Sequence, residues 1–154
     1  MIMNLGKLGE NQFSLHIVDY QFPDNRANDY DANWLLIEII VTTPNDQWQK
    51  TAPALLTWEV QSLISWLEAV NIDREDWNCI NFLEPNLSFC LKGRDDDNVV
   101  LGVHLALEFK PSRELSHETI VEIDCTHEEL SAWIMDLKVQ LAQFPIQLTF
   151  HDEI

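Results

Sequence analysis

Glycine is scarce in this sequence, and its scarcity excludes several kinds of site. Only four of the 154 residues are glycine. A loop that wraps phosphate needs glycines so that backbone N–H groups can approach the ligand, and neither G-x-G-x-x-G nor a P-loop occurs. The G-x-S-x-G turn that presents a nucleophilic serine is also missing. We therefore predict no cofactor and no catalytic residue.

Cysteine is also rare, and its spacing is uninformative. The three cysteines, Cys79, Cys90 and Cys125, are odd in number, lie far apart and form no C-x-x-C pair. Such spacing suggests neither a disulfide framework nor a zinc site. We predict that each is a small, buried, apolar residue of a reducing compartment.

Long apolar runs are absent. No stretch approaches the roughly 18–20 apolar residues that a membrane-spanning helix needs. The first residues, MIMNLGKLGENQF, carry one lysine and no sustained apolar segment, unlike a secretion signal. With 46% hydrophobic and 23% charged residues, the composition is that of a globular protein. We expect one domain over residues 1–154, located in the cytoplasm.

Basic residues are few, and this is the strongest global feature. Nine Lys and Arg stand against 26 Asp and Glu, which gives a formal charge of −17. Binding to nucleic acid or to an anionic membrane depends on Lys and Arg, so both are excluded as partners. A cationic protein would instead be attracted, although an acidic surface also serves solubility alone.

The hydrophobic pattern predicts strands interrupted by two helices. Alternation or enrichment in β-branched residues indicates strands at 13–20, 33–43, 47–52, 79–84, 87–93, 99–109 and 118–124. A period of 3.6 residues predicts a helix from Thr57, its N-cap, to Val70. A second helix begins with the capping box of Thr126 and Glu129 and stops before Pro145. This order predicts an α+β fold, a largely antiparallel sheet of about six or seven strands with both helices on one face.

The stretch PDNRANDYDANW, residues 23–34, is the most tempting metal-binding sequence. Asp29, Asp31 and Asn33 stand at alternate positions, as the first ligands of a calcium loop do. However, Trp34 occupies the position that requires glycine, and Ile40 the position of the bidentate glutamate. We therefore interpret the stretch as an acidic loop and predict no metal site.

The histidines offer one weaker alternative. No H-x-H, H-x-x-x-H or H-E-x-x-H spacing occurs. His104 and Glu108 share a predicted strand face but would lie roughly 13 Å apart from the rise per residue. A carboxylate on a neighbouring strand, such as Glu38 or Glu122, would come closer. An enzyme of unrecognised type with a His104–carboxylate site therefore stays open as an alternative.

Tryptophan is abundant, with six residues in the chain. Trp133 lies on the apolar stripe of the second helix and is expected in the core. Aromatic residues ringed by acids can also anchor a protein partner, because they bury a large area at a low entropy cost. Core packing is the simpler interpretation of the others.

Several segments together resemble the bacterial WapI-type immunity proteins. They are YQFPDNRANDYDANWLLIEIIV, APALLTWEVQSLISWLEAV, FLEPNLSFCL, VHLALEFKP and ELSAWIMDLKVQLAQFP, in this order between Tyr20 and Pro145. The most distinctive are FLEPNLSF and the Y-D-x-N-W-L entry to the second strand. The resemblance implies a cytoplasmic protein that neutralises the C-terminal domain of a polymorphic toxin, expected to be a nuclease, and it carries no catalytic residues.

Resemblance and charge agree, because a toxin that cleaves RNA must present Lys and Arg to phosphate. We predict contact through acidic residues of the loops and strand faces: Asp24, Asp29, Asp31, Glu38, Asp95, Asp96, Asp97, Glu108 and Glu122. The chain itself is expected to be a monomer or a homodimer. An uncharacterised oligomeric scaffold is the remaining alternative.

Overall fold

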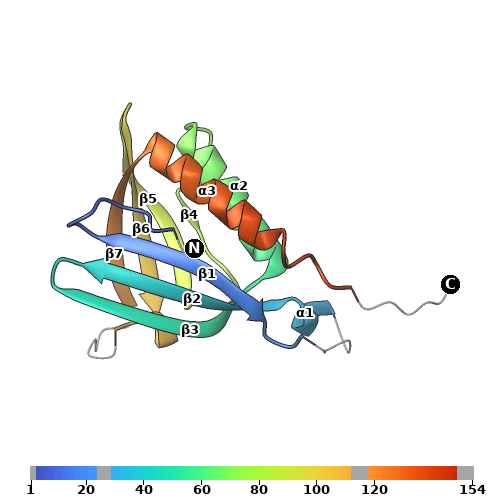
Figure 1. Ribbon diagram of the computed structural model, residues 1–154. Coiled ribbons are helices and arrows are strands. Elements are labelled where there is room, and N and C mark those ends of the chain that lie inside the picture. Colours follow the sequence, from blue (N-terminus) through green and yellow to red (C-terminus); the bar gives the residue numbers. More distant parts are fainter. Residues whose placement is uncertain (1–2, 24–28, 112–117, 149–154) are drawn as a thin grey trace.

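The computed structural model describes residues 3–23, 29–111 and 118–148, and these form two antiparallel sheets and two long helices (Figure 1). The elements in chain order are β1 (Gln12–Tyr20), α1 (Asp29–Ala32), β2 (Trp34–Thr43), β3 (Asp46–Leu56), α2 (Thr57–Asn71), β4 (Cys79–Ile80), β5 (Leu87–Arg94), β6 (Asn98–Ala106), η1 (Leu107–Phe109), β7 (Glu118–Thr126) and α3 (His127–Leu141). The predicted α+β class, with antiparallel strands and two packed helices, is confirmed. The seven strands of the described residues form two sheets, of three and four strands, where the prediction had a single sheet.

The first sheet has the order β1-β2-β3. Its inner face follows from alternation, since Leu15 pairs with Ile39 and Ile17 with Ile37, and all four side chains are buried. The alternate positions carry the polar pair His16 and Glu38 on the outer face. The sheet therefore has one apolar side toward the core.

The second sheet has the order β4-β5-β6-β7 and lies behind the first, its strands running across those of β1–β3 (Figure 1). Phe89, Val103 and Val121 stand opposite one another on the inner face of its three longer strands and are buried. Strand β4 has only two residues, so the strand predicted at 79–84 is mostly loop.

The prediction that all three cysteines are free is wrong. Cys79 and Cys90 are directly opposite in the β4–β5 pair, with Cα atoms 4.0 Å apart, and form a disulfide. Residues directly opposite on neighbouring antiparallel strands have their Cβ atoms close together, and this pairing allows the bridge. Cys125 is free and buried, as predicted, and burial raises the pKa of its thiol to about 12.

Helices α2 and α3 lie side by side and close one side of the space between the sheets (Figure 1). Thr126 caps α3 as predicted, since its side chain accepts from the Glu129 N–H and Glu129 accepts from the Thr126 N–H. The N-cap predicted for α2 is one residue late. Leu56 is the N-cap, its N–H donates to Glu59 at 2.9 Å, and Thr57 is the first helical residue.

The two sheets and α3 meet around Phe13. Its ring centroid lies 5.9 Å from that of Phe89 in the second sheet and 6.0 Å from that of Trp133 in α3. The side chain of Gln140 in α3 also bonds the outer edge of β1, accepting from the Ile17 N–H at 2.7 Å and donating to the Leu15 carbonyl at 3.0 Å. These bonds occupy backbone groups of an edge strand, which protects it from pairing with another chain.

The strand predicted at residues 99–109 ends early. β6 stops at Ala106, and Leu107–Phe109 form the 3₁₀ turn η1, with Leu107 at a φ of 52°. Glu108 is therefore not on a strand face. The Trp48 indole donates to the Phe109 carbonyl at 3.0 Å, which joins this turn to the first sheet. In the described part of the chain, no helix is long and apolar enough to cross a bilayer.

Candidate partner-binding surface

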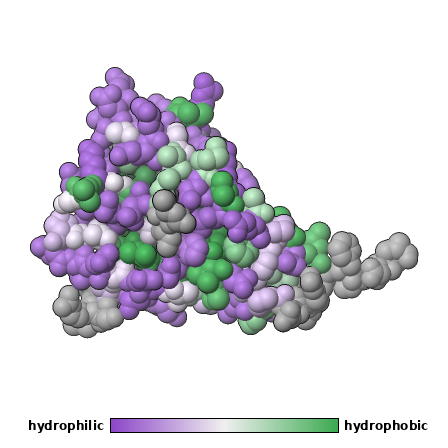
Figure 2. Space-filling view, in the orientation of Figure 1, coloured by the Kyte–Doolittle hydropathy of each residue, from purple (hydrophilic) through white to green (hydrophobic). Residues whose placement is uncertain are grey.

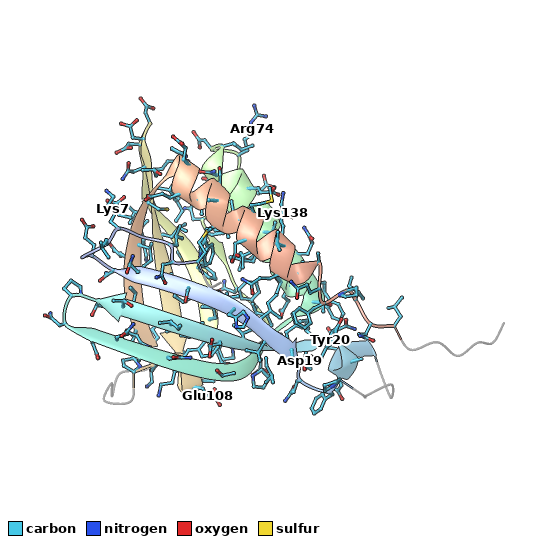
Figure 3. All side chains as sticks on the ribbon, in the orientation of Figure 1. Lys7, Asp19, Tyr20, Arg74, Glu108 and Lys138 are labelled. Carbon is cyan, nitrogen blue, oxygen red and sulfur yellow. A yellow bond between two sulfur atoms is a disulfide. The ribbon has the colours of Figure 1, made fainter. Side chains whose placement is uncertain are left out.

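The carboxylates predicted to contact a partner do not form one surface. Their positions are β2 for Glu38, the β5–β6 turn for Asp95, Asp96 and Asp97, η1 for Glu108, β7 for Glu122 and the short helix α1 for Asp29 and Asp31, while Asp24 falls outside the described residues. Glu108 lies at the lower edge of the molecule, far from Arg74 and the loop after α2 at the top (Figure 3). A single partner surface would use only some of them.

Glu38 and Glu108 are engaged with side chains of the same molecule. Glu38 is half-buried on the outer face of the first sheet, where it accepts from the Gln49 side chain at 2.6 Å and lies 3.6 Å from His16. Glu108 accepts from the buried amide of Asn86 at 2.6 Å. Both therefore have a local structural role.

The β5–β6 turn holds the best-exposed group of predicted residues. Asp95, Asp96 and Asp97 are all exposed at its tip. The Asp95 carboxylate accepts from the backbone N–H groups of Asn98 at 2.8 Å and Asp97 at 2.9 Å, and these bonds lower its pKa. The turn therefore has a fixed shape and keeps its negative charge near neutral pH.

The structure adds an acidic loop that the sequence analysis did not select. The loop after α2 carries Asp73 and Glu75 to the side of Arg94, next to the β5–β6 turn. Arg94 donates to both Glu75 oxygens, at 2.9 and 3.2 Å, to Asp73 and to the Val70 carbonyl at 3.2 Å. The hydrogen bonds between Arg94 and Glu75 raise the pKa of Arg94 and lower that of Glu75, while the partial burial of the pair opposes both shifts.

His127 joins this loop region to α3. Its Nδ1 lies 2.9 Å from the Asn71 side-chain oxygen and 3.1 Å from the Asn71 carbonyl, and its Nε2 lies 3.2 Å from the Asp95 carbonyl. The Asn71 amide donates in turn to the His127 carbonyl at 3.1 Å and to Ser131 at 2.8 Å. One histidine therefore holds the end of α2, the start of α3 and the β5–β6 turn together.

A hollow of about 440 Å³ lies among these elements. Its charged lining consists of Asp73, Asp95 and Asp96 against Arg94, which is already paired. We call this region, made of Asp73, Glu75, Arg94, Asp95, Asp96 and His127, the acidic end. Its excess of fixed carboxylates suits Lys or Arg side chains of a partner.

The acidic end shows what the sequence reasoning missed. Asp95 to Asp97 were found as a run of like charges, whereas Asp73 and Glu75 belong to the run DRED at 73–76 directly after a predicted helix. The DRED run was therefore the feature of the sequence that could have identified Asp73 and Glu75. Arg94 lies beside this run because the end of β5 packs against the end of α2 and the loop after it, a tertiary contact that the sequence does not show.

The alternative hypothesis of a His104–carboxylate site can be compared with the contacts of His104. His104 Nδ1 lies 3.4 Å from a Glu118 carboxylate oxygen, on the outer face of β6 and β7. The carboxylate beside His104 is thus that of Glu118, and not that of Glu38, Glu122 or Glu108, which the sequence analysis considered. Across the described residues, no three His, Cys, Asp or Glu side chains form a cluster that could hold a metal ion.

Comparison with known proteins gives one finding. No curated protein and no solved structure matches the chain. The model of the immunity protein WapI-like family matches residues 3–145, which cover both sheets and both long helices. The chain therefore belongs to the immunity protein WapI-like family.

Proposed function

We propose that this protein binds and neutralises a basic C-terminal domain of a polymorphic toxin, and that the toxin domain is a nuclease. The observation that carries the proposal is membership of the immunity protein family over residues 3–145. The formal charge of −17 supports it, since the charge favours a cationic partner.

The physical argument for a nuclease starts from its substrate. A nuclease holds phosphates through Lys, Arg and backbone N–H groups, so its active cleft is positively charged. An acidic protein that occupies the cleft excludes the nucleic acid and gains fast association from the opposite charges. Because the nucleic acid at risk is inside the cell, the proposal places this protein in the cytoplasm.

The proposal assigns no catalytic residue to the chain. The His104–Glu118 pair is explained as a cross-strand polar contact, in which one carboxylate borders the imidazole on the outer face of the sheet. Neutralisation is by binding alone, so its strength is an affinity and not a rate of turnover.

The test is co-expression with the toxin domain encoded next to this gene. The wild-type protein is expected to restore growth, and its complex with the inactivated toxin domain should weaken as salt rises, since exposed charges are screened. Failure to restore growth, or an affinity independent of salt, contradicts the proposal.

Charge reversals at two places on the surface test where the toxin domain binds. Asp95→Lys with Asp96→Lys reverses the acidic end, and the affinity is expected to fall by about a hundredfold, as the loss of close charge pairs would give. Asp19→Lys makes the same kind of change near Tyr20, on the side of the molecule away from Arg74 (Figure 3), and should leave the affinity within about threefold.

A further inference from the structure

Helix α3 has two apolar stripes, and only one of them is buried. Leu130, Trp133, Ile134 and Leu137 face the core. Ala132, Met135, Val139 and Ala142 repeat at helical spacing on the other side and are exposed, with Met135 at 58% and Val139 at 56%. In Figure 2, green and pale green residues follow the course of α3 between purple ones. An amphipathic helix needs one apolar stripe to pack on its own protein, so the second is unexplained by the fold.

A groove runs beside this exposed stripe. A hollow of about 480 Å³ separates the exposed sides of α2 and α3, and Ile72, Ile134 and Met135 supply its apolar lining. Ile72, just past the end of α2, is 65% exposed. Glu68 of α2 and Lys138 of α3 form an ion pair of 2.6 Å across the groove. The groove therefore has an apolar part, made of Ile72, Ile134 and Met135, and its lysine is already paired with Glu68.

The groove continues into the acidic end. Asn71 and Ile72 line both the 480 Å³ hollow and the 440 Å³ hollow that contains Asp73, Asp95 and Asp96. An occupant of the groove that extends past Ile72 meets these carboxylates. The surface thus combines an apolar centre with a charged end, which is the usual division between the core and the rim of a protein interface.

The charges select the kind of occupant. A second copy of this chain would bring another −17 charge to an acidic rim, and like charges facing each other oppose association. An anionic membrane is repelled for the same reason. A protein segment with apolar side chains followed by Lys or Arg is complementary to both parts of the surface.

We infer that the α2–α3 groove and the acidic end together seat a segment of the toxin that presents apolar side chains followed by basic ones. This inference rests on the proposed function and adds the place of contact and the chemistry of the partner. The apolar contacts slow the dissociation of the complex, while the carboxylates increase its association rate.

The test compares polar substitutions of exposed apolar residues on two faces. The double variant Met135→Gln with Val139→Thr makes the two large residues of the exposed stripe polar while nearly keeping their size, and Ile120→Thr makes an exposed residue on the outer face of β7 polar. Binding of the inactivated toxin domain is measured over a series of salt concentrations. We expect the double variant to bind at least about tenfold more weakly with an unchanged salt slope.

Charge variants complete the design. Asp95→Asn with Asp96→Asn should lower the association rate and flatten the salt slope, whereas Asp19→Asn, an exposed residue of β1 outside the predicted contact set, should change neither by more than about twofold. Unchanged affinity in the Met135/Val139 variant would overturn the inference while leaving the proposed function intact. Self-association of the wild type that disappears in the double variant, with toxin binding unaltered, would also overturn it. If the wild type neither binds nor protects, the proposed function itself has failed.

Discussion

Asn33 shows how one side chain can be misjudged from its neighbours. In the sequence it stands in a possible calcium loop, whereas in the structure it is fully buried between α1, α2 and the segment after α3. Its amide oxygen accepts from the Thr57 hydroxyl at 2.9 Å and from the Gln147 N–H at 2.7 Å, and its amide nitrogen donates to the Gln147 carbonyl at 2.6 Å. Asn33 therefore joins three segments far apart in the sequence.

Replacing Asn33 with alanine should destabilise the protein markedly. The change leaves buried donors and acceptors without partners, and we expect the free energy of unfolding to fall by about 2–3 kcal/mol. Urea unfolding measures it, with Asn45→Ala in the exposed β2–β3 turn as the control, where the loss should stay below about 0.5 kcal/mol. Equal losses in both variants would show that the Asn33 bonds contribute little.

The Arg94–Glu75 pair predicts a dependence of stability on pH. Arg94 holds the pKa of Glu75 below its ordinary 4.5 in the folded protein, so the pair stabilises the fold above that pH. The stabilisation is lost as the pH falls from about 4.5 through the lowered pKa, because the carboxylate becomes protonated.

Glu75→Gln should therefore unfold more easily than the wild type at pH 7, and the difference should shrink as the pH falls below 4.5. Urea unfolding at a series of pH values measures the difference, and Asp76→Asn, an exposed neighbour, is the control. A difference that stays constant from pH 7 to the acid range would contradict a role for the Glu75 charge.

Among the elements, β4 is a very short strand that the disulfide bond to β5 anchors in its sheet. β4 has two residues at the edge of its sheet, and Cys79 bonds covalently to Cys90 of β5 across the pair. The bridge joins positions 11 residues apart in the sequence and closes the loop between them. In the chain-entropy account, such a closure contributes about 2–3 kcal/mol to stability.

Thiol counting tests this arrangement. The native protein should react with no thiol reagent at neutral pH, since two cysteines are bridged and burial raises the pKa of Cys125 to about 12. Mild reduction should expose two reactive thiols, and unfolding after reduction should expose three. Two rapidly reacting thiols before reduction would show that Cys79 and Cys90 are unpaired.

Most elements were predictable from the sequence, because alternation and the helical period are local signals. The capping box of Thr126 and Glu129 placed the start of α3 correctly. The failures concern non-local or conformational facts. The Cys79–Cys90 bridge depends on the register of two strands. The end of β6 depends on the positive φ of Leu107, a conformation that is rare for an apolar residue and so is not predicted from its side chain.

For the whole molecule, the sign of the net charge is predictable from the sequence, but the arrangement of the charges on the surface is not. Composition alone establishes −17, yet Glu38 and Glu108 are engaged in internal contacts while Asp95 and Asp96 border a hollow. The groove between α2 and α3 was not predicted from the sequence. The helical period identifies the buried stripe of α3, and Met135 and Val139 lie on the opposite side of that helix. The predicted contact residues therefore remain predictions, with the acidic end the best placed.

The net charge also predicts how salt affects stability in the absence of any partner. Carboxylates repel one another in the compact state, and they separate on unfolding, so the formal charge of −17 destabilises the fold at low ionic strength. Raising NaCl from about 10 mM to about 200 mM shortens the screening length from roughly 30 Å to under 10 Å. If this recovers about 1–2 kcal/mol, the Tm should rise by about 2–8 °C for a domain of this size.

A variant with two exposed charges removed, Asp96→Asn and Asp97→Asn, provides the matched comparison. Both residues lie at the tip of the β5–β6 turn, so their removal reduces the local repulsion without changing the core. Its Tm at about 10 mM NaCl should exceed that of the wild type, and its rise with salt should be smaller, because less repulsion remains to be screened. Thermal unfolding at pH 7 followed by circular dichroism measures both quantities. A wild-type Tm that is flat or falls over this range of salt would mean that the ion pairs of Lys7, Arg94 and Lys138, which salt weakens, outweigh the repulsion among the carboxylates.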